Sequence, residues 1–325
     1  MRKILSLFVL ALFLSSCASL PFTEEKVEIE KNLFTNLPGS SGKVFAVKFD
    51  DTNDAHPQQG VESADVVYIT QVEAGLTRLL GIYSSNYPEA LGPIRSVRIS
   101  DLSILGEYGR VGFLYSGAQS KMRPAIAEAN LVNLSAERNP PSIYFNDPAR
   151  RSPYSMMVKP NLLLEKAADV EFAKKPGWQY GPRAKGAQKI ISAKIDWPNA
   201  SYEAYWSATE RKFLLKHNGR ENMASSGAQL GSPMMVIQLV KLSPSEYGDK
   251  FGGVTPLSET IGTGKAYVLR NGERFVTVWN RPTAESGTTF SFSDGTVMNF
   301  DRGQVWVALT DREPEFTSRA IEKTK

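Results

Sequence analysis

The sequence predicts an α+β protein in which an N-terminal mixed α/β domain is followed by a mainly antiparallel β domain. The chain has 325 residues, which is long enough for two domains. In its first half, strand-like apolar runs alternate with segments of helical periodicity. In its second half, short alternating strands are separated by Asn-Gly and Asp-Gly pairs, which are the strongest short signals for β-hairpins.

In the first half, β-branched and aromatic runs indicate strands, and apolar residues at mixed helical spacing indicate helices. The expected strands are residues 44–49, 65–72, 79–84 and 111–115, and the expected helices are residues 96–107, 120–130 and 161–170.

In the second half, every expected element is a strand of four to seven residues. These strands are residues 193–197, 201–206, 213–216, 234–240, 266–269, 275–279, 289–292, 296–300 and 305–309.

The first 17 residues match a bacterial lipoprotein signal peptide. Arg2 and Lys3 precede an apolar run over residues 4–14, which is too short for a stable membrane span. The run leads into Leu-Ser-Ser-Cys, which resembles a lipobox ending at Cys17, the only cysteine. The alternative is an ordinary secretory signal with an incidental cysteine. Lipidation of Cys17 explains the odd cysteine count, and we expect attachment to the extracytoplasmic face of a cell membrane.

The remaining boundaries follow from changes in composition. Residues 18–41 are charged and run into Gly39-Ser40-Ser41-Gly42, so we expect a flexible tether. The N-terminal domain is expected over residues 42–185 and the C-terminal domain over residues 186–312, with a frayed tail over residues 313–325.

The composition excludes some classes of partner. Hydrophobic residues make up 42% of the chain, charged residues 22%, and the formal net charge is +4. Nucleic-acid-binding proteins normally carry a basic stripe, and no run of five Lys or Arg occurs here. We therefore expect no nucleic-acid partner, and no motif in the sequence predicts a cofactor.

The segment over residues 73–98 is the strongest candidate for a ligand site. It holds Arg78, Arg95 and Arg98 around a strand-like run closed by Gly/Pro turns. Guanidinium groups are planar, permanently charged donors suited to carboxylate or phosphate oxygens, and a following helix start would also attract an anion. The alternative is that these arginines pair with the chain's own acids, namely Glu73, Asp101 or Glu107.

Two further segments add candidate ligand-binding residues. Ser116 and Gly117 follow an expected strand and precede an expected helix, an order that often frames a ligand site. Arg151 lies in a long Pro-rich and Arg-rich loop, and loops of that length are usually functional or disordered.

An enzymatic alternative rests on acids. Glu73 and Asp101 are weak candidates for the acid or base of a glycan hydrolase or transferase, although sequence spacing cannot place them at a working separation. We expect no metal site. The acidic loop after the first strand does not fit a calcium motif, and the only two histidines, His56 and His217, fall in different predicted domains.

Several spaced motifs together resemble the YerB-like bacterial lipoproteins, a family with paired N- and C-terminal domains of unknown function. The motifs are EAGLTR at 73–78, GPIRSVR at 92–98, YSG at 115–117, GKA at 264–266, WNR at 279–281 and GQVW at 303–306. The resemblance covers nearly all of residues 43–310. It implies a membrane-anchored extracytoplasmic protein with no established catalytic activity.

The chain departs from that family pattern in two places. It has Asp50-Asp51 and His56 where an Asp-Asn pair and an Arg are expected, and Tyr154 within a Pro-Tyr-Ser sequence where Pro-His-Asn is expected. We expect a non-enzymatic lipoprotein that binds an anionic envelope component or a protein partner.

Overall fold

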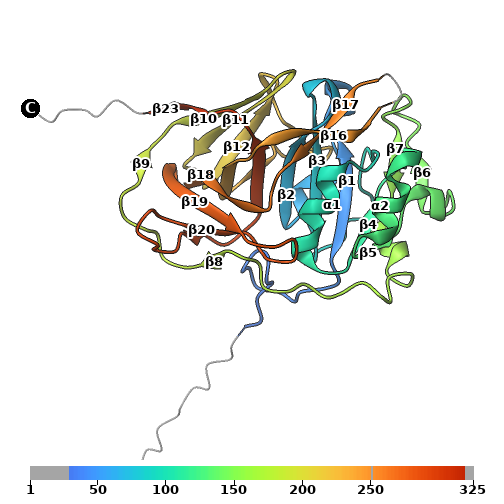
Figure 1. Cartoon of the computed structure of the whole chain (residues 1–325), viewed down its shortest axis with the longest axis horizontal. Coiled ribbons are helices and arrows are strands. Elements are labelled where there is room, and N and C mark those ends of the chain that lie inside the picture. The colour runs from blue at the N-terminus through green and yellow to red at the C-terminus, as the bar shows by residue number, and fades with distance from the viewer. Residues whose placement is uncertain (1–28, 250–251, 319–325) are drawn as a thin grey trace, which may run out of the picture.

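The computed structural model describes residues 29–249 and 252–318. Its main feature is an 11-stranded mixed sheet with the strand order β20-β19-β18-β15-β22-β2-β3-β1-β4-β5, and β9 pairs with β19 at its side (Figure 1). The strands are β1 Phe45–Asp50, β2 Val66–Gln71, β3 Thr77–Tyr83, β4 Val111–Leu114, β5 Leu131–Asn133, β9 Gln188–Lys189, β15 Met234–Leu239, β18 Gly262–Arg270, β19 Glu273–Arg281, β20 Thr289–Ser291 and β22 Val305–Thr310.

Strand β22 joins the two halves of the chain within this sheet. It lies between β2 and β15 and runs parallel to both, with Trp306 opposite Val67 on one side and Met235 on the other. All six residues of β22 are buried, as expected for a strand covered on both faces. The two predicted domains therefore share one continuous sheet.

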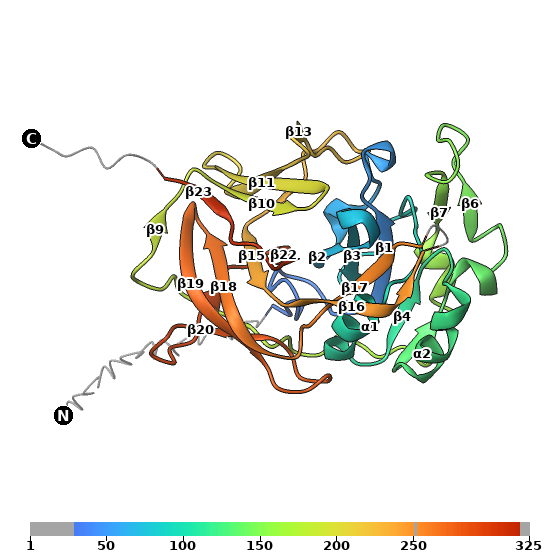
Figure 2. The same cartoon turned by 45° about the horizontal axis from the view of Figure 1, so that its top comes forward.

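A second sheet of six strands packs against one face of the large sheet (Figure 2). Side chains from both sheets form one core, including Phe49, Tyr202, Phe213 and Trp306. The strands of the second sheet are β10 Ser192–Trp197, β11 Ala200–Ser207, β12 Lys212–His217, β13 Arg220–Glu221, β14 Gly231–Ser232 and β23 Glu315–Thr317.

Two short helices, α1 Ile99–Leu105 and α2 Arg123–Glu128, cover the other face of the large sheet. They contribute Ile104 and Ile126 to a second core. Three small two-stranded pairs complete the fold: β6 Tyr144–Asn146 with β7 Met156–Val158, β16 Leu242–Gly248 with β17 Val254–Ser258, and β8 Gln179–Tyr180 with β21 Asn299–Phe300.

The α+β prediction is confirmed, but the helices are shorter than expected. Helix α1 begins only at Ile99, because the Asp101 carboxylate accepts the backbone N–H of Arg98 and fixes the helix start there. The helix expected over 161–170 is a single 3-10 turn, Pro160–Leu163.

The prediction of a flexible tether over residues 18–41 is wrong for its second half. Phe34 is 1% exposed and packs edge-on against Tyr108, with ring centroids 5.3 Å apart. The Asn32 side chain donates to Ser84 Oγ at 3.0 Å. Apolar burial and these contacts hold this segment on the folded body.

The predicted tail is likewise ordered in part, because Glu315–Thr317 forms β23 and pairs with β10. The predicted signal peptide and its lipidated Cys17 lie outside the described residues. Among the residues described, no helix is both long and apolar enough to cross a bilayer.

Candidate functional site

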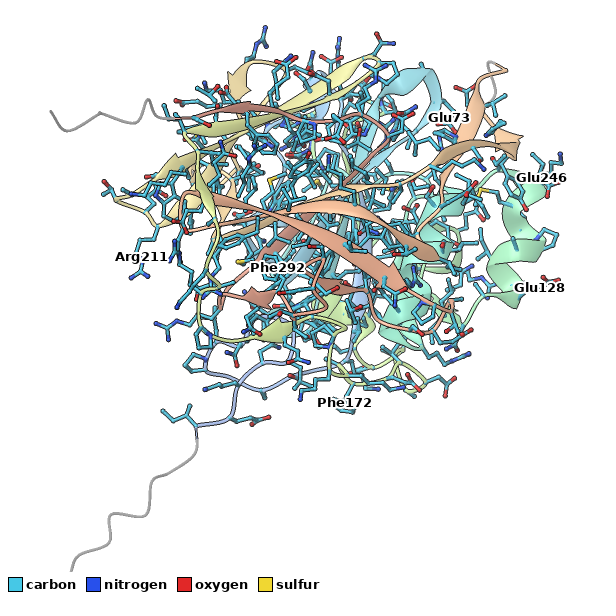
Figure 3. The ribbon with its side chains drawn as sticks, turned by 60° about the vertical axis from the view of Figure 1, so that its left-hand side comes forward. Glu73, Glu128, Phe172, Arg211, Glu246 and Phe292 are labelled. Carbon is cyan, nitrogen blue, oxygen red and sulfur yellow. The ribbon has the colours of Figure 1, made fainter. Side chains whose placement is uncertain are left out.

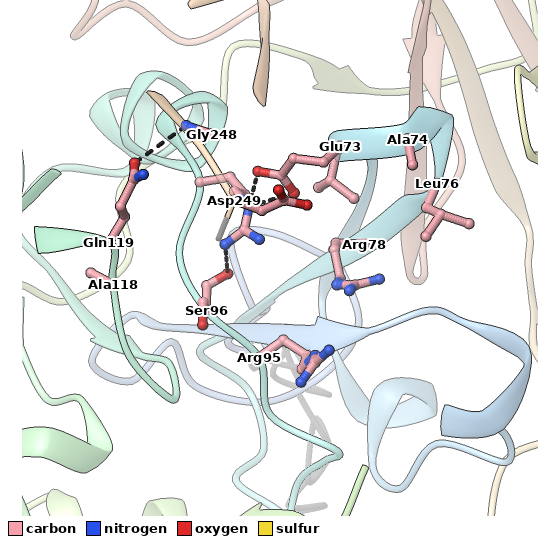
Figure 4. Close-up of a pocket in the computed structure, with 12 residues that line it drawn as sticks. Glu73, Ala74, Leu76, Arg78, Arg95, Ser96, Ala118, Gln119, Gly248 and Asp249 are labelled. Atoms are coloured by element: carbon pink, nitrogen blue, oxygen red, sulfur yellow. Dashed lines mark hydrogen bonds and ion pairs between the residues drawn. The ribbon is translucent and has the colours of Figure 1, made fainter. Parts of the chain in front are cut away.

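The three predicted arginines line one pocket of about 670 Å³. The pocket lies where the loop between β2 and β3, the segment before α1 and the end of β16 meet, so both halves of the chain form it (Figure 4). Figure 3 shows Glu73 beside the hairpin of β16 and β17. The lining residues are Val72, Glu73, Ala74, Leu76, Arg78, Arg95, Ser96, Arg98, Ala118, Gln119, Gly248 and Asp249.

On one side of the pocket, Arg78 and Arg95 share the carboxylate of Asp50. Arg78 lies directly opposite Asp50 in the β1–β3 ladder, with its Nη1 3.3 Å from Oδ1. Arg95 Nε lies 2.5 Å from Oδ2. Asp50 is fully buried, whereas the Arg95 side chain is 27% exposed. Two guanidinium groups against one carboxylate leave an excess positive charge on this side.

Arg98 is held more completely. Its Nε lies 2.7 Å from Glu73 Oε1, and its Nη1 donates to the Val97 carbonyl at 3.1 Å. Glu73 is 5% exposed and also accepts a hydrogen bond from the Thr255 hydroxyl on β17. Arg98 therefore links the start of α1 to the β16–β17 hairpin. The alternative reading, pairing with the chain's own acids, applies most fully to this arginine.

Asp101 does not line the pocket. It is fully buried, pairs with Lys48 Nζ at 2.6 Å and caps α1. Burial lowers the pKa of Lys48, and Asp101 opposes that effect. A carboxylate without exposed surface, already engaged by an ammonium group and a helix cap, is not placed to meet a substrate.

The pocket wall does not include Ser116, Gly117 or Arg151. The Ser116 N–H donates to the Arg95 carbonyl, and the Val97 N–H donates to the Gly117 carbonyl, so these two residues hold the backbone that carries the arginines. Arg151 is outside the pocket, with its Nη2 2.7 Å from Asp54 and 73% of its side chain exposed.

The two histidines, expected apart, lie together around a buried carboxylate. The His56 and His217 rings stack with centroids 4.5 Å apart and an interplanar angle of 13°. His56 Nε2 is 3.3 Å from Asp51 Oδ1, and His217 Nε2 is 3.8 Å from Asp51 Oδ2. The expectation that they are separated is wrong, because β12 packs against the loop after β1.

Neutral donors also surround Asp51. The hydroxyls of Thr77 and Tyr202 donate to its oxygens at 2.6 Å and 2.8 Å, and Gln58 Nε2 donates at 3.1 Å. Burial alone would raise the pKa of Asp51, but His217, His56 and the hydrogen bond from Thr77 outweigh it and hold that pKa well below its ordinary value. Burial lowers the pKa of His217, which Asp51 opposes only in part.

Comparisons with known proteins agree with the family resemblance. The model "Protein of unknown function (DUF3048) N-terminal domain" matches residues 34–173, and the corresponding C-terminal model matches residues 193–307. The chain belongs to the DUF3048 family. The pocket of this DUF3048 protein uses both matched regions, because Gly248 and Asp249 come from the C-terminal one.

One relative of this DUF3048 chain is a Bacillus subtilis protein. The chain is 21% identical over 324 residues to "Putative lipoprotein YerB", covering 94% of this chain and 92% of that protein. The crystal structure of YerB from the same organism superposes with a TM-score of 0.73 at 16% identity, covering 87% of this chain and 97% of that one. At that identity the likeness shows the fold.

Proposed function

We propose that this protein is a membrane-anchored, extracytoplasmic binding protein that holds a carboxylate or phosphate group of an envelope ligand in the arginine-lined pocket. The N-terminal lipobox-like sequence supports the anchor, as does the name of the Bacillus subtilis relative. The ligand-binding part rests on the pocket alone.

The excess charge beside Asp50 carries this proposal. Arg78 and Arg95 place two guanidinium groups on one side of the pocket, while Glu73 and Asp249 lie on another side (Figure 4). An anion entering beside Arg95 would gain charge-assisted hydrogen bonds without displacing a buried ion pair. Arg98 is expected to contribute less to anion binding, because its Nε and Nη1 already donate to Glu73 and to the Val97 carbonyl.

The glycan-cleaving alternative receives less support. Two working carboxyl groups must face each other across a substrate. Asp101 is fully buried with Lys48, and Glu73 is tied to Arg98 and Thr255. Ligand binding is therefore the function that the pocket favours.

Calorimetric titration of the detergent-solubilised full chain with pyrophosphate and with a carboxylate-bearing wall peptide tests the proposal. Loss of a hydrogen bond to a charged group costs about 1.5–3 kcal/mol, so we expect Arg95→Gln to weaken binding about 10- to 100-fold. Arg123→Gln is the matched control. Arg123 lies outside the arginine-lined pocket and forms an exposed ion pair with Glu137, with a separation of 3.3 Å. Equal losses in both variants would indicate unspecific surface attraction and refute the proposal.

Arg98→Gln separates structure from binding. It leaves the buried Glu73 carboxylate with the Thr255 hydroxyl as its remaining partner. We expect the free energy of unfolding to fall by about 1–3 kcal/mol. Affinity should change less than in Arg95→Gln. The opposite ranking in affinity would move the anion to the Arg98 side of the pocket.

A further inference from the structure

We infer that Asp51, His56 and His217 form a binding site for a divalent transition-metal ion of the zinc type. Two imidazole nitrogens and one carboxylate are a ligand set that suits such ions. The site is distinct from the arginine-lined pocket and does not depend on the proposed function.

The distances favour this assignment. One ligand atom from each of the three residues lies within 4.8 Å of the others. Ligands bound about 2.0–2.1 Å from a tetrahedral ion lie about 3.4 Å apart. His56 Nε2 lies 3.3 Å from Asp51 Oδ1, which meets that value, and His217 Nε2 lies 3.8 Å from the other oxygen, Oδ2. Because the two ring planes are only 13° apart, the imidazoles must turn toward each other for both Nε2 lone pairs to reach one ion.

His217 has a buried ring nitrogen that the hydrogen bonds around Asp51 do not satisfy. Its side chain is 4% exposed, and its Nε2 has no hydrogen-bond partner among the described residues. A buried polar nitrogen without a partner costs free energy, so such atoms in native proteins call for an explanation. Because Nε2 points toward Asp51, coordination of an ion between them would satisfy it.

The residues around Asp51 fit the role of outer partners. Metal-binding carboxylates are usually oriented by hydrogen bonds from neighbouring groups. The hydroxyls of Thr77 and Tyr202 and the amide of Gln58 do this here. All three are uncharged, so they would not repel a cation bound beside the carboxylate.

A small pocket of about 80 Å³ gives an ion a route to the site. It is lined by both histidines together with Asn53, Arg220 and Glu221. Arg220 opposes the approach of a cation, and the neighbouring Glu221 offsets that charge. The His56 side chain is 17% exposed, so it is the ligand nearest to solvent.

The composition leaves few other side chains that could bind a transition-metal ion in such a test. The chain contains only two histidines, and its single cysteine is the predicted lipidation site. A tag-free, chelator-treated full chain in detergent is titrated with Zn²⁺ by calorimetry and with Co²⁺ by visible absorption. We expect one ion per chain and a Co²⁺ spectrum of a low-coordinate site with nitrogen ligands.

Variants then locate the ion. Changing an outer partner of a metal site typically costs 10- to 100-fold in affinity, so we expect His217→Gln and His56→Gln each to lose at least about 100-fold and Tyr202→Phe about 10-fold. Glu128→Gln, which changes an exposed acid at the end of α2, is the control and should change affinity by less than about threefold. Thermal unfolding in the presence of chelator checks that each variant is folded.

Two outcomes would overturn the assignment. One is the absence of stoichiometric Zn²⁺ binding in the wild-type chain. The other is binding that persists unchanged in the folded His56→Gln variant, which retains the buried His217 and so serves even if His217→Gln does not fold.

Discussion

The buried pair between Lys48 and Asp101 allows a quantitative test of what holds the arginine-bearing segment in place. Both side chains are fully buried, and Lys48 Nζ lies 2.6 Å from Asp101 Oδ1. At an effective dielectric constant of about 20, their attraction is about 6 kcal/mol. Desolvation of two ions costs several kcal/mol each and offsets most of this gain. The pair as a whole therefore contributes little to the free energy of unfolding, whereas removal of one partner lowers that free energy markedly.

Lys48→Met keeps the length and apolar stem of the side chain and strands the Asp101 carboxylate. We expect the free energy of unfolding to fall by about 3–5 kcal/mol. Asp101→Asn retains an oxygen that can accept the Arg98 N–H, and Lys48 keeps its 3.1 Å contact with the Thr70 hydroxyl. Because burial already lowers the pKa of Lys48, the lysine can lose its proton, and the cost should be smaller, about 1–3 kcal/mol.

The double variant Lys48→Met with Asp101→Asn removes both charges and should recover about 2–3 kcal/mol relative to the sum of the single changes. Urea unfolding followed by tryptophan fluorescence measures all four proteins. Additive losses would refute the reasoning, because they would mean that neither single variant leaves an uncompensated buried charge.

Two further predictions concern packing and pH. A Cβ on Gly177 would lie 2.3 Å from the Gly287 carbonyl carbon, so Gly177→Ala should lower the free energy of unfolding by about 1–3 kcal/mol. A Cβ on Gly117 would meet only the flexible Glu137 carboxylate at 3.3 Å, so Gly117→Ala should cost less than half as much. Equal urea midpoints for the two variants would contradict this. Hydrogen bonds from Lys174 and from the Arg110 N–H hold the pKa of Glu171 below its ordinary value of 4.5. A carboxyl group whose pKa is lower in the folded than in the unfolded protein stabilises the fold at pH values above its unfolded-state pKa. This stabilisation is lost as the pH falls through the folded-state pKa. Unfolding between pH 3 and 6 should therefore show a shallower pH dependence in Glu171→Gln than in the wild type, and identical slopes would contradict the assignment.

Much of the strand pattern could be predicted because it is local. The runs that form β1, β2 and β4 are rich in β-branched and aromatic residues, and each lies within one or two residues of its expected position. Short elements were missed where the signal is weak. β5 has three residues, and the hairpin of β6 and β7 lies inside a segment whose prolines suggested a loop.

The position of β22 could not be predicted from its own sequence. Its six residues could pair with a strand from either half of the chain. The pairing is decided by which neighbouring strands and side chains bury both faces of β22. The structure places it parallel to β2, more than 230 positions earlier in the chain by the register Val66 to Val305. That long-range pairing turns two expected domains into one sheet.

The same cause explains why sequence reasoning found the arginine pocket but missed the histidine cluster. Arg78, Arg95 and Arg98 lie within one short segment, so their proximity follows from a strand and a turn. His56 and His217 are brought together only when the second sheet packs on the first, and Asp51 meets Tyr202 of β11 through that same packing. No spacing rule connects residues of the loop after β1 with a residue of β12. A buried Asp51 beside two histidines therefore becomes visible only in the assembled fold, and any ion bound there would stabilise the contact between the two sheets as well as its own site.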